Sequence, residues 1–361
     1  PADTTVNIQI KNNLQTDSTK GYTVETKPVT DKWGKNATVY ILKINEAGSY
    51  KLTKDEGVKT LWRVEIAAEN STVNLTLSNV TLNLSETGTG SGNTSGVPAL
   101  EITGDCKTVI TLVGNNTLKG GANCAGLQNG EHPVTITGEG TLNAIGGYRG
   151  AGIGGGANAN GGNITIESGT VNATGGLSGA GIGGGHKGNG TNITIKGGTV
   201  TAKGQNMGAG IGGGGSGDGY NITINGGKVT ATGGSGAGIG GGGAGNGENI
   251  RISGGTVNAT SASGAGIGGG QCGDGHDISI SKGTVAVSGG GGSADIGGGN
   301  GWSADYPAGS ASNITVKDGT TSKQGEGELN IGVANDGGVK FLVIRNGKEI
   351  TYTSKGNLSE I

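Results

Sequence analysis

The sequence predicts an all-β fold, a three-sided parallel β-helix, and three observations lead to it. Glycine supplies 85 of the 361 residues, against a usual share of about 7%, and each glycine inside a helix costs about 1 kcal/mol relative to alanine. Ile, Val and Leu alternate with polar residues in short runs between the glycine blocks, which is the period of a β-strand. These runs also recur at a fixed interval, as repeat architectures require.

Composition excludes several classes of protein. Collagen needs glycine at every third position and abundant proline, whereas this chain has only five prolines and its glycines form blocks. The 25 Lys and Arg residues nearly balance the 27 Asp and Glu residues, so we expect neither nucleic acid nor an anionic membrane as a partner. No run approaches the roughly 18 apolar residues of a membrane span. The chain opens on Pro1 without a methionine, which favours a processed, secreted or cell-surface protein.

One unit recurs through the middle of the chain and justifies three strands per coil. It reads Asn-Ile-Thr-Ile, then Gly-Thr-Val-Thr-Ala, then a glycine turn and Gly-Ala-Gly-Ile-Gly-Gly-Gly. The isoleucines of the third block follow one another at steps of 28 or 29 residues, at Ile153, Ile182, Ile211, Ile239, Ile267 and Ile296. A single repeat cannot bury its own apolar face, so the repeats must stack, with equivalent strands parallel and about 4.8 Å apart.

Alternation within each block predicts which side chains fill the interior. The expected inward positions are Ile164 and Ile166, Val171 and Ala173, and Ala151 and Ile153, with their repeat mates. Asp295 is expected to point outward. The Gly-Gly-Gly after each isoleucine supplies the positive φ that a tight turn requires. We expect a right-handed helix, which is the usual preference.

Degenerate repeats extend the helix to about eight coils in all and lead into caps at both ends. Residues 134–144, 109–118 and 73–82 repeat the alternating blocks toward the N-terminus. We expect residues 1–70 to form an N-terminal β cap and first degenerate coil, 71–320 the β-helix, and 321–361 a C-terminal hairpin cap. The hairpin prediction rests on Val339–Ile344 and Glu349–Thr353, which flank Asn346-Gly347, a strong turn signal.

Asparagine and aspartate recur in the loops and predict two ladders along the solenoid. One contains Asn163, Asn192, Asn221, Asn249 and Asp277, and its neighbour contains Asn160, Asn189, Asp218, Asn246 and Asp274. We favour structural ladders in which each side chain bonds its neighbour or its own turn. The alternative is a calcium site at Asp218, Asp274 and Asp277. Calcium takes six to eight oxygens, and Asn246 separates the two acids of the second ladder, so we favour the structural reading. Calcium apart, we expect no cofactor.

Groups capable of catalysis are sparse in the repeats. Asp274, His276 and Asp277 form the densest polar cluster, which we interpret as solvated turn residues. A looser group on the earlier coils comprises Glu101, Asp105, Glu131, His132, Glu139 and Arg149. The three cysteines are widely spaced and odd in number, so we expect free thiols. A Cys106–Cys124 pair is the one disulfide left open.

The last coil is interrupted by an aromatic insertion. Ile278 and Ile314 are 36 residues apart instead of 28 or 29, and the inserted stretch contains Trp302, Asp305 and Tyr306. Insertions on repeat scaffolds are common binding sites. The two rings would stack on sugar faces while Asp305 accepts hydrogen bonds from hydroxyls, or they would cover the last coil. Tyr148 and Tyr220 lie in turns and are further candidate platforms.

The repeat unit, together with Val-Asn-Leu-Thr-Leu and Gly-Asn-Asn-Thr-Leu before it, resembles a family of glycine-rich parallel β-helix domains. These domains occur in large secreted and surface proteins of anaerobic Gram-positive bacteria. The resemblance covers residues 72 to about 300. It implies an extracellular module, often described as carbohydrate-binding, and equally a spacer or adhesin shaft. It transfers no functional residue to this chain.

The sequence therefore favours a non-catalytic glycan-binding or adhesive module whose partner is a polysaccharide or a host or cell-wall glycan. The second hypothesis is a structural protein, either a stalk or a fibre subunit that self-associates through the solenoid ends. A polysaccharide lyase or hydrolase comes third, because the acids are scattered. Ice binding is the weakest hypothesis, since Lys228 and Arg251 interrupt the threonine faces.

Overall fold

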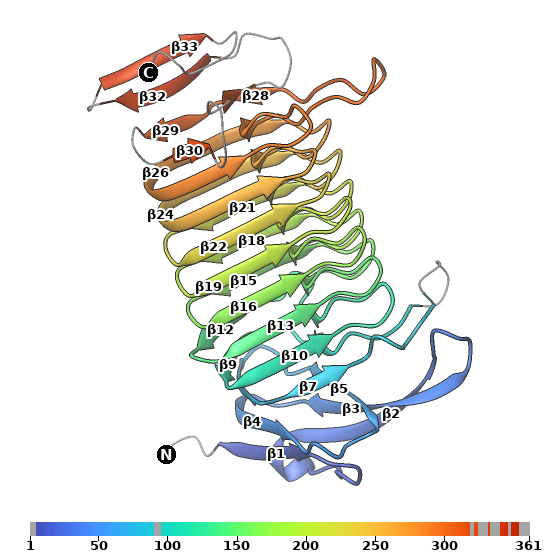
Figure 1. Ribbon diagram of the computed structural model, residues 1–361. Helices are drawn as coiled ribbons and strands as arrows, with labels where there is room; N and C mark the ends of the chain where they lie inside the picture. Colours follow the sequence, from blue (N-terminus) through green and yellow to red (C-terminus); the bar gives the residue numbers. More distant parts are fainter. Residues whose placement is uncertain are drawn as a thin grey trace.

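The computed structural model describes residues 5–89, 95–317, 321–323, 331–332, 340–345 and 348–353. It confirms an all-β parallel solenoid of about eight turns, stacked along one axis in Figure 1. Each turn contributes up to three strands, and the two longest strands, β24 and β26, run continuously over the first two sides. Within the described residues no helix has the length and hydrophobicity needed to cross a membrane.

Strands of the first side come from the Asn-Ile-Thr-Ile blocks and their degenerate equivalents. They are β6 (Thr72–Ser78), β9 (Lys107–Val113), β12 (Val134–Gly138), β15 (Gly161–Ile166), β18 (Gly190–Ile195), β21 (Gly219–Ile224), β24 (Gly247–Ser261) and β26 (Gly275–Ser288). Those of the second side are β7 (Thr81–Asn83), β10 (Asn115–Lys119), β13 (Thr141–Ile145), β16 (Thr170–Thr174), β19 (Thr199–Lys203) and β22 (Lys228–Gly233).

Strands of the third side are short because glycine surrounds each isoleucine. They are β8 (Leu100–Ile102), β11 (Leu127–Gln128), β14 (Ile153–Gly154), β17 (Ile182–Gly183), β20 (Ile211–Gly212), β23 (Ile239–Gly240), β25 (Ile267–Gly268) and β27 (Ile296–Gly297). Within this sheet each strand from β8 to β27 pairs in parallel with its counterpart one coil away.

The register places equal residues on top of one another, as the repeat predicts. Ile164 pairs with Ile193, Val171 with Val200, and Ile153 with Ile182. The predicted inward residues are buried throughout this ladder. The degenerate coils also pair in the predicted register, with Val134 beside Ile164 and Leu127 beside Ile153. Burial of these stacked aliphatic side chains supplies the main driving force for folding.

The N-terminal end continues the same ladders and adds a hairpin. Strand β1 (Val6–Ile10) pairs in parallel with β4 (Gly48–Lys54), which pairs with β6. Strands β2 (Tyr22–Thr30) and β3 (Asn36–Ile44) form an antiparallel hairpin, and β3 runs parallel to β5 (Leu61–Ile66). A short 3₁₀ turn, η1 (Ser18–Lys20), precedes the hairpin.

The C-terminal end carries one more partial coil and two antiparallel strands. The partial coil comprises β28 (Ala311–Ser312), β29 (Thr315–Lys317), β30 (Thr321–Lys323) and β31 (Ile331–Gly332). Strand β32 (Lys340–Arg345) pairs antiparallel with β33 (Lys348–Thr353). The predicted turn at Asn346-Gly347 lies outside the described residues.

The prediction that Asp295 points to solvent is wrong. Its side chain is 1% exposed, and Oδ1 accepts a hydrogen bond from the backbone N–H of Gly289 at 2.8 Å. In the earlier coils this position is glycine, and a Cβ on Gly210 would lie 2.6 Å from Thr232 N and Gly238 O. The third strand therefore packs against neighbouring backbone at this position. Asp295 directs its carboxylate to a turn N–H instead of to water.

Candidate functional site

Two stacks of loops lie side by side along one corner of the solenoid. One stack precedes the third strand of each coil and the other follows it. Backbone hydrogen bonds join them, from His186 N to Arg149 O (2.8 Å) and from Gly243 N to Met207 O (2.7 Å). The insertion between β27 and β28 projects from the same side of the molecule as these loops (Figure 1).

A groove of about 280 Å³ runs along this corner next to the insertion. Six of the residues that line it carry its chemistry: Met207, Ser235, Gln271, Cys272, Trp302 and Tyr306. The second stack has no side chain at Gly243, which leaves room above the backbone. A Cβ on Gly243 would meet Ser235 Cβ at 3.4 Å, an ordinary contact. The small residues Ser235, Gly243 and Ala244 line the groove together with the larger Met207 and the two aromatic rings.

Trp302 and Tyr306 form a tilted pair at one end of the groove. Their ring centroids are 5.7 Å apart with an interplanar angle of 31°. A tight turn holds them together, because Trp302 N donates to Tyr306 O (2.9 Å) and Tyr306 N donates to Ser303 O (3.1 Å). The residues are 70% and 58% exposed, so most of both rings lies outside the core. Asp305 is exposed in the same turn.

The other two candidate aromatic residues lie apart from this pair. Tyr148 is on the same corner at the coil of β14, is 41% exposed, and has the Arg149 guanidinium 5.7 Å from its ring centroid. Tyr220 is a half-buried residue of β21, paired in register with Thr191 and Glu248. The structure thus groups Trp302, Asp305 and Tyr306, places Tyr148 farther along their corner, and separates Tyr220 from them.

Side-chain amides form a ladder beside the first-side strands. Asn192 Nδ2 donates to Asn163 Oδ1 (3.0 Å), Asn221 Nδ2 to Asn192 Oδ1 (3.1 Å) and Asn249 Nδ2 to Asn221 Oδ1 (2.5 Å). These residues have positive φ angles between 50° and 56°, a region that Asn tolerates better than most residues. The hydrogen bonds make the stack a structural element.

Asp277 changes the polarity of that ladder. A carboxylate has no proton to donate, so Asn249 Oδ1 instead accepts a hydrogen bond from Arg251 Nε at 3.0 Å. On the other side, Asp277 Oδ1 accepts from Asn313 Nδ2 at 2.9 Å. The carboxylate is therefore engaged in the ladder.

The second ladder joins side chains to the backbone of the next coil. Oδ1 of Asp218 accepts from Asn246 N at 2.7 Å, and Oδ1 of Asp274 accepts from Ser310 N at 2.6 Å. In the part of the chain that the structure describes, no three His, Cys, Asp or Glu residues come together as a metal-binding group. Each of the candidate calcium ligands, Asp218, Asp274 and Asp277, thus accepts a hydrogen bond from a residue of the next coil.

Comparison with known proteins gives one finding, which agrees with this geometry. Five segments match a family model described as Beta helix repeat: 134–157, 164–186, 193–215, 222–243 and 250–271. These five segments are thus similar to the β-helix repeat, and the structure shows them as successive coils of the solenoid. Neither the curated proteins nor the solved structures include a match to the chain. The repeats supply the two loop stacks, and the aromatic turn follows the last matched repeat.

Next to the last repeat, a His and an Asp meet a serine. His276 Nδ1 lies 2.8 Å from Ser312 Oγ, and Nε2 lies 3.6 Å from Asp274 Oδ2. Asp274 Oδ1 already accepts from both the N–H and the hydroxyl of Ser310. These contacts tie the last repeat to the coil that follows it.

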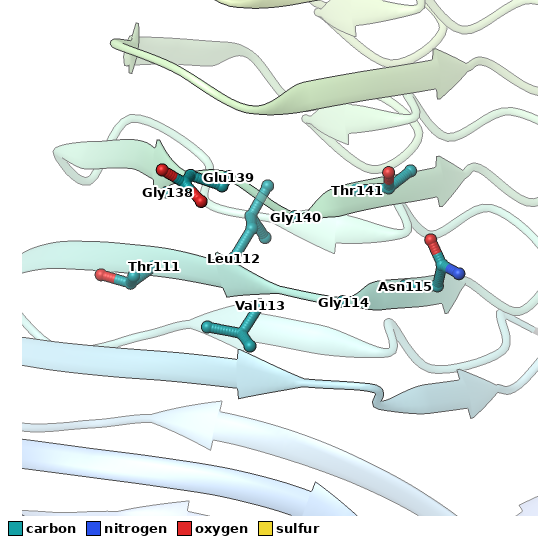
Figure 2. Close-up of a pocket in the computed structure, with 9 residues that line it drawn as sticks. All are labelled: Thr111, Leu112, Val113, Gly114, Asn115, Gly138, Glu139, Gly140 and Thr141. Atoms are coloured by element: carbon teal, nitrogen blue, oxygen red, sulfur yellow. The ribbon is translucent and has the colours of Figure 1, made fainter.

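A second hollow, of about 500 Å³, lies at the opposite end of the β-helix repeats. Figure 2 shows Leu112 pointing toward the turn of Glu139 and Val113 pointing away from it. Glu139 is the one carboxylate of the lining, whose remaining members are Thr111, Leu112, Val113, Gly114, Asn115, Gly138, Gly140 and Thr141. Glycoside hydrolysis ordinarily uses two carboxylates, so this hollow lacks half of that machinery.

Sequence reasoning missed a buried ion cluster that precedes the repeats. Arg63 is buried; Nη1 lies 2.7 Å from Glu101 Oε2, and Nη2 contacts Glu65. Burial raises the pKa of Glu65, but attraction to Arg63 and Lys43 outweighs it and leaves the pKa below its ordinary value. Arg63 and Glu101 are 38 residues apart in a coil of irregular length, so no repeat spacing signals their contact.

The cysteines are free, as the sequence predicts. Burial raises the pKa of Cys124 to about 12 and also raises that of Cys106. Cys272 is partly exposed in the groove, with Sγ 3.7 Å from Tyr306 O. Sequence reasoning also missed the groove residues Met207 and Gln271, which carry no motif and line one groove with Trp302 only because the coils stack on one another.

Proposed function

We propose that this solenoid is a non-catalytic glycan-binding module of a secreted or cell-surface protein, with the groove at Trp302 and Tyr306 as its site. One observation carries the proposal: two largely exposed rings form a pair at the end of a groove. Single exposed apolar side chains are common on soluble proteins, whereas clustered ones mark interaction sites.

The chemistry of the groove suits a sugar. Aromatic faces pack against the C–H faces of pyranose rings and leave the hydroxyl groups free for hydrogen bonds. Gln271 and Ser235 line the groove, and Asp305 lies in the same turn as the rings. These groups offer donors and acceptors for hydroxyls, which fix the orientation of a ligand.

The residues that line the groove favour binding of a glycan over its cleavage. None of the residues that line the groove is Asp or Glu, whereas most glycosidases place two carboxylates on either side of the scissile bond. The hollow at Glu139 offers one carboxylate. The groove therefore supports recognition in preference to hydrolysis.

The test measures co-sedimentation of the chain with insoluble plant, mucin and bacterial-wall polysaccharides. We expect Trp302→Ala and Tyr306→Ala each to weaken binding at least about tenfold, which corresponds to about 1.4 kcal/mol. Thermal stability should not change, because both rings lie outside the core. The matched control is Trp33→Ala, since Trp33 is 68% exposed in the turn between β2 and β3 of the N-terminal hairpin, and the change should leave binding intact.

Alkylation of Cys272 gives an independent readout of the same site. The buried thiol of Cys124, whose pKa is raised to about 12, is almost entirely protonated at pH 8. The thiolate is the form that reacts, and Cys272 is the cysteine that is partly exposed. Iodoacetamide should therefore modify Cys272 first, and a bound glycan should slow that reaction. Equal binding by wild type and Trp302→Ala, with no protection of Cys272, would contradict the proposed site.

A second candidate function is assembly through the solenoid end. Among the described residues β1 pairs with β4 alone, so its other edge presents unpaired backbone groups. Such an edge is a template for another strand. Sedimentation of the protein in a tube without polysaccharide, with regular polymers in electron micrographs, would favour this function over glycan binding.

A further inference from the structure

The corner that holds the groove continues far beyond it toward the N-terminus. Leu177 and Tyr148 are 39% and 41% exposed on the first loop stack, one and two coils before Met207. Backbone contacts keep these loops in register, with Met207 N donating to Leu177 O at 3.4 Å. Tyr148, Leu177 and Met207 thus follow one line parallel to the solenoid axis on successive coils, and this line leads into the groove that ends at the aromatic pair.

Basic groups collect at the Tyr148 end of this line. Arg149 and His186 are joined through their backbones, and Lys187 follows on the second stack. Burial, then the charges of Arg149 and Lys187, lower the pKa of His186. Within the described part of the chain neither Arg149 nor Lys187 forms an ion pair with a carboxylate. Arg149 and Lys187 therefore bring two positive charges to this part of the corner, and neither is taken up by an ion pair in the described residues.

The length of this line fits a polymer. Tyr148 precedes β14 and Trp302 follows β27, with β17, β20, β23 and β25 between them. Five steps at about 4.8 Å give roughly 24 Å. An extended chain of pyranoses repeats at close to the spacing between coils, so successive sugars would meet equivalent loops.

We propose that the corner from Tyr148 to Tyr306 binds one extended chain of an acidic polysaccharide, parallel to the solenoid axis. Trp302 and Tyr306 stack on sugar rings at one end. Arg149 and Lys187 bind sugar carboxylates at the other end through charge-assisted hydrogen bonds, which are stronger than hydrogen bonds between neutral groups. The inference rests on the proposed glycan-binding function and adds to it the class of ligand and its direction.

The experiment is calorimetry of the full chain with oligogalacturonates from the disaccharide to the octasaccharide. Affinity should rise with length until the oligomer spans the corner from Tyr148 to Tyr306, called the track below, and then level off. Methyl esterification of the carboxylates should weaken the longest oligomer about tenfold. The double variant Arg149→Gln, Lys187→Gln should bind the acidic and esterified octasaccharides equally, whereas the control Lys228→Gln, an exposed change on another side, should behave as wild type.

The outcomes separate the two proposals. Trp302→Ala should weaken every length, and the double variant should weaken only oligomers long enough to reach it. Equal affinity for all lengths, with no effect of the double variant, would overturn the track and leave the aromatic site. Binding of neutral glycans in preference to oligogalacturonates would overturn the acidic class. Failure of every glycan to bind would overturn both proposals.

Discussion

At the residue scale, the glycine that follows each third-side isoleucine is required by backbone conformation. The residues after the third-side isoleucines have φ angles of 130° to 134°, and Gly212 is one of them. A Cβ on Gly212 would lie 2.0 Å from Gly240 O. Left-handed conformations cost a side chain about 1–2 kcal/mol, and overpacking adds about 1–3 kcal/mol. These effects act together at Gly212.

We therefore expect Gly212→Ala to lower the free energy of unfolding by about 3 kcal/mol or more, as measured by urea denaturation. Gly243→Ala is the matched control, because Gly243 lacks a positive φ and its Cβ would make contacts of 3.4 Å or more. It should cost under about 1 kcal/mol. Similar losses for the two variants would mean that backbone conformation does not decide the need for glycine.

Sequence reasoning anticipates these glycines but not every strained position. The Gly-Gly-Gly blocks predict a positive φ after each isoleucine, and Gly212 has one. Lys187, Ser216, Ala244 and Cys272 also have φ angles of 61° to 64°, although none of these residues favours that region. Contacts between coils hold them there, since Ser216 N donates to Gly243 O at 2.8 Å. Such contacts exist only after the coils stack.

At the scale of elements, the ion cluster of Arg63, Glu65 and Glu101 joins β5 to β8. Folding lowers the pKa of Glu65 from its ordinary value of 4.5. The charged carboxylate therefore favours the folded state above pH 4.5, and this contribution is lost as the pH falls through the lowered value. Acid should weaken the attachment of the N-terminal coil to the rest of the solenoid.

Glu65→Gln should lower the free energy of unfolding by about 3 kcal/mol at pH 7, because it breaks a buried pair. The difference from wild type should shrink below pH 4.5. There wild-type Glu65 is first protonated in the unfolded chain and, at still lower pH, in the folded protein as well. Glu167→Gln breaks an exposed pair with Lys196 and should cost at most about 1 kcal/mol. A pH-independent difference for Glu65→Gln would contradict this assignment.

Elements differ in how far the sequence predicts them. The repeated strands follow from period and alternation, and Ile164 and Ile193 pair as predicted. The insertion at Trp302 is visible as a break in spacing, but its ring pair depends on a turn closed by Tyr306 O. Asp295 was misplaced because alternation assumes an open outer face, whereas backbone covers that position.

At the scale of the whole molecule, stability is spread along one dimension. Each coil contacts mainly the coil before and the coil after it, so stability approximates a sum of coil terms and interface terms. The register is unbroken from β15 to β22, with Thr174 beside Lys203 and Lys203 beside Thr232. Any one of these coils can be removed in principle if the cut joins equivalent positions.

Deletion of residues 204–232 joins Lys203 to Gly233 and removes one coil of 29 residues. Because Lys203 and Thr232 are register partners, the next coil should stack on the one before the cut. We expect cooperative thermal unfolding and an unchanged β-type circular dichroism spectrum, with a lower free energy of unfolding because one interface is lost. The acidic oligomer at which affinity levels off should also shorten by one sugar.

A shorter deletion provides the control for that argument. Removal of residues 204–218 joins the end of a second-side strand to the start of a first-side strand and omits the third side, including β20. The isoleucine ladder of the third sheet would then have a gap, because Ile211, which pairs with both Ile182 and Ile239, would be missing. This variant should aggregate or unfold without cooperativity. If both deletions fold equally well, the coil is not the unit of stability. The expected shortening of the bound oligomer by one sugar would then no longer follow from the loss of one coil.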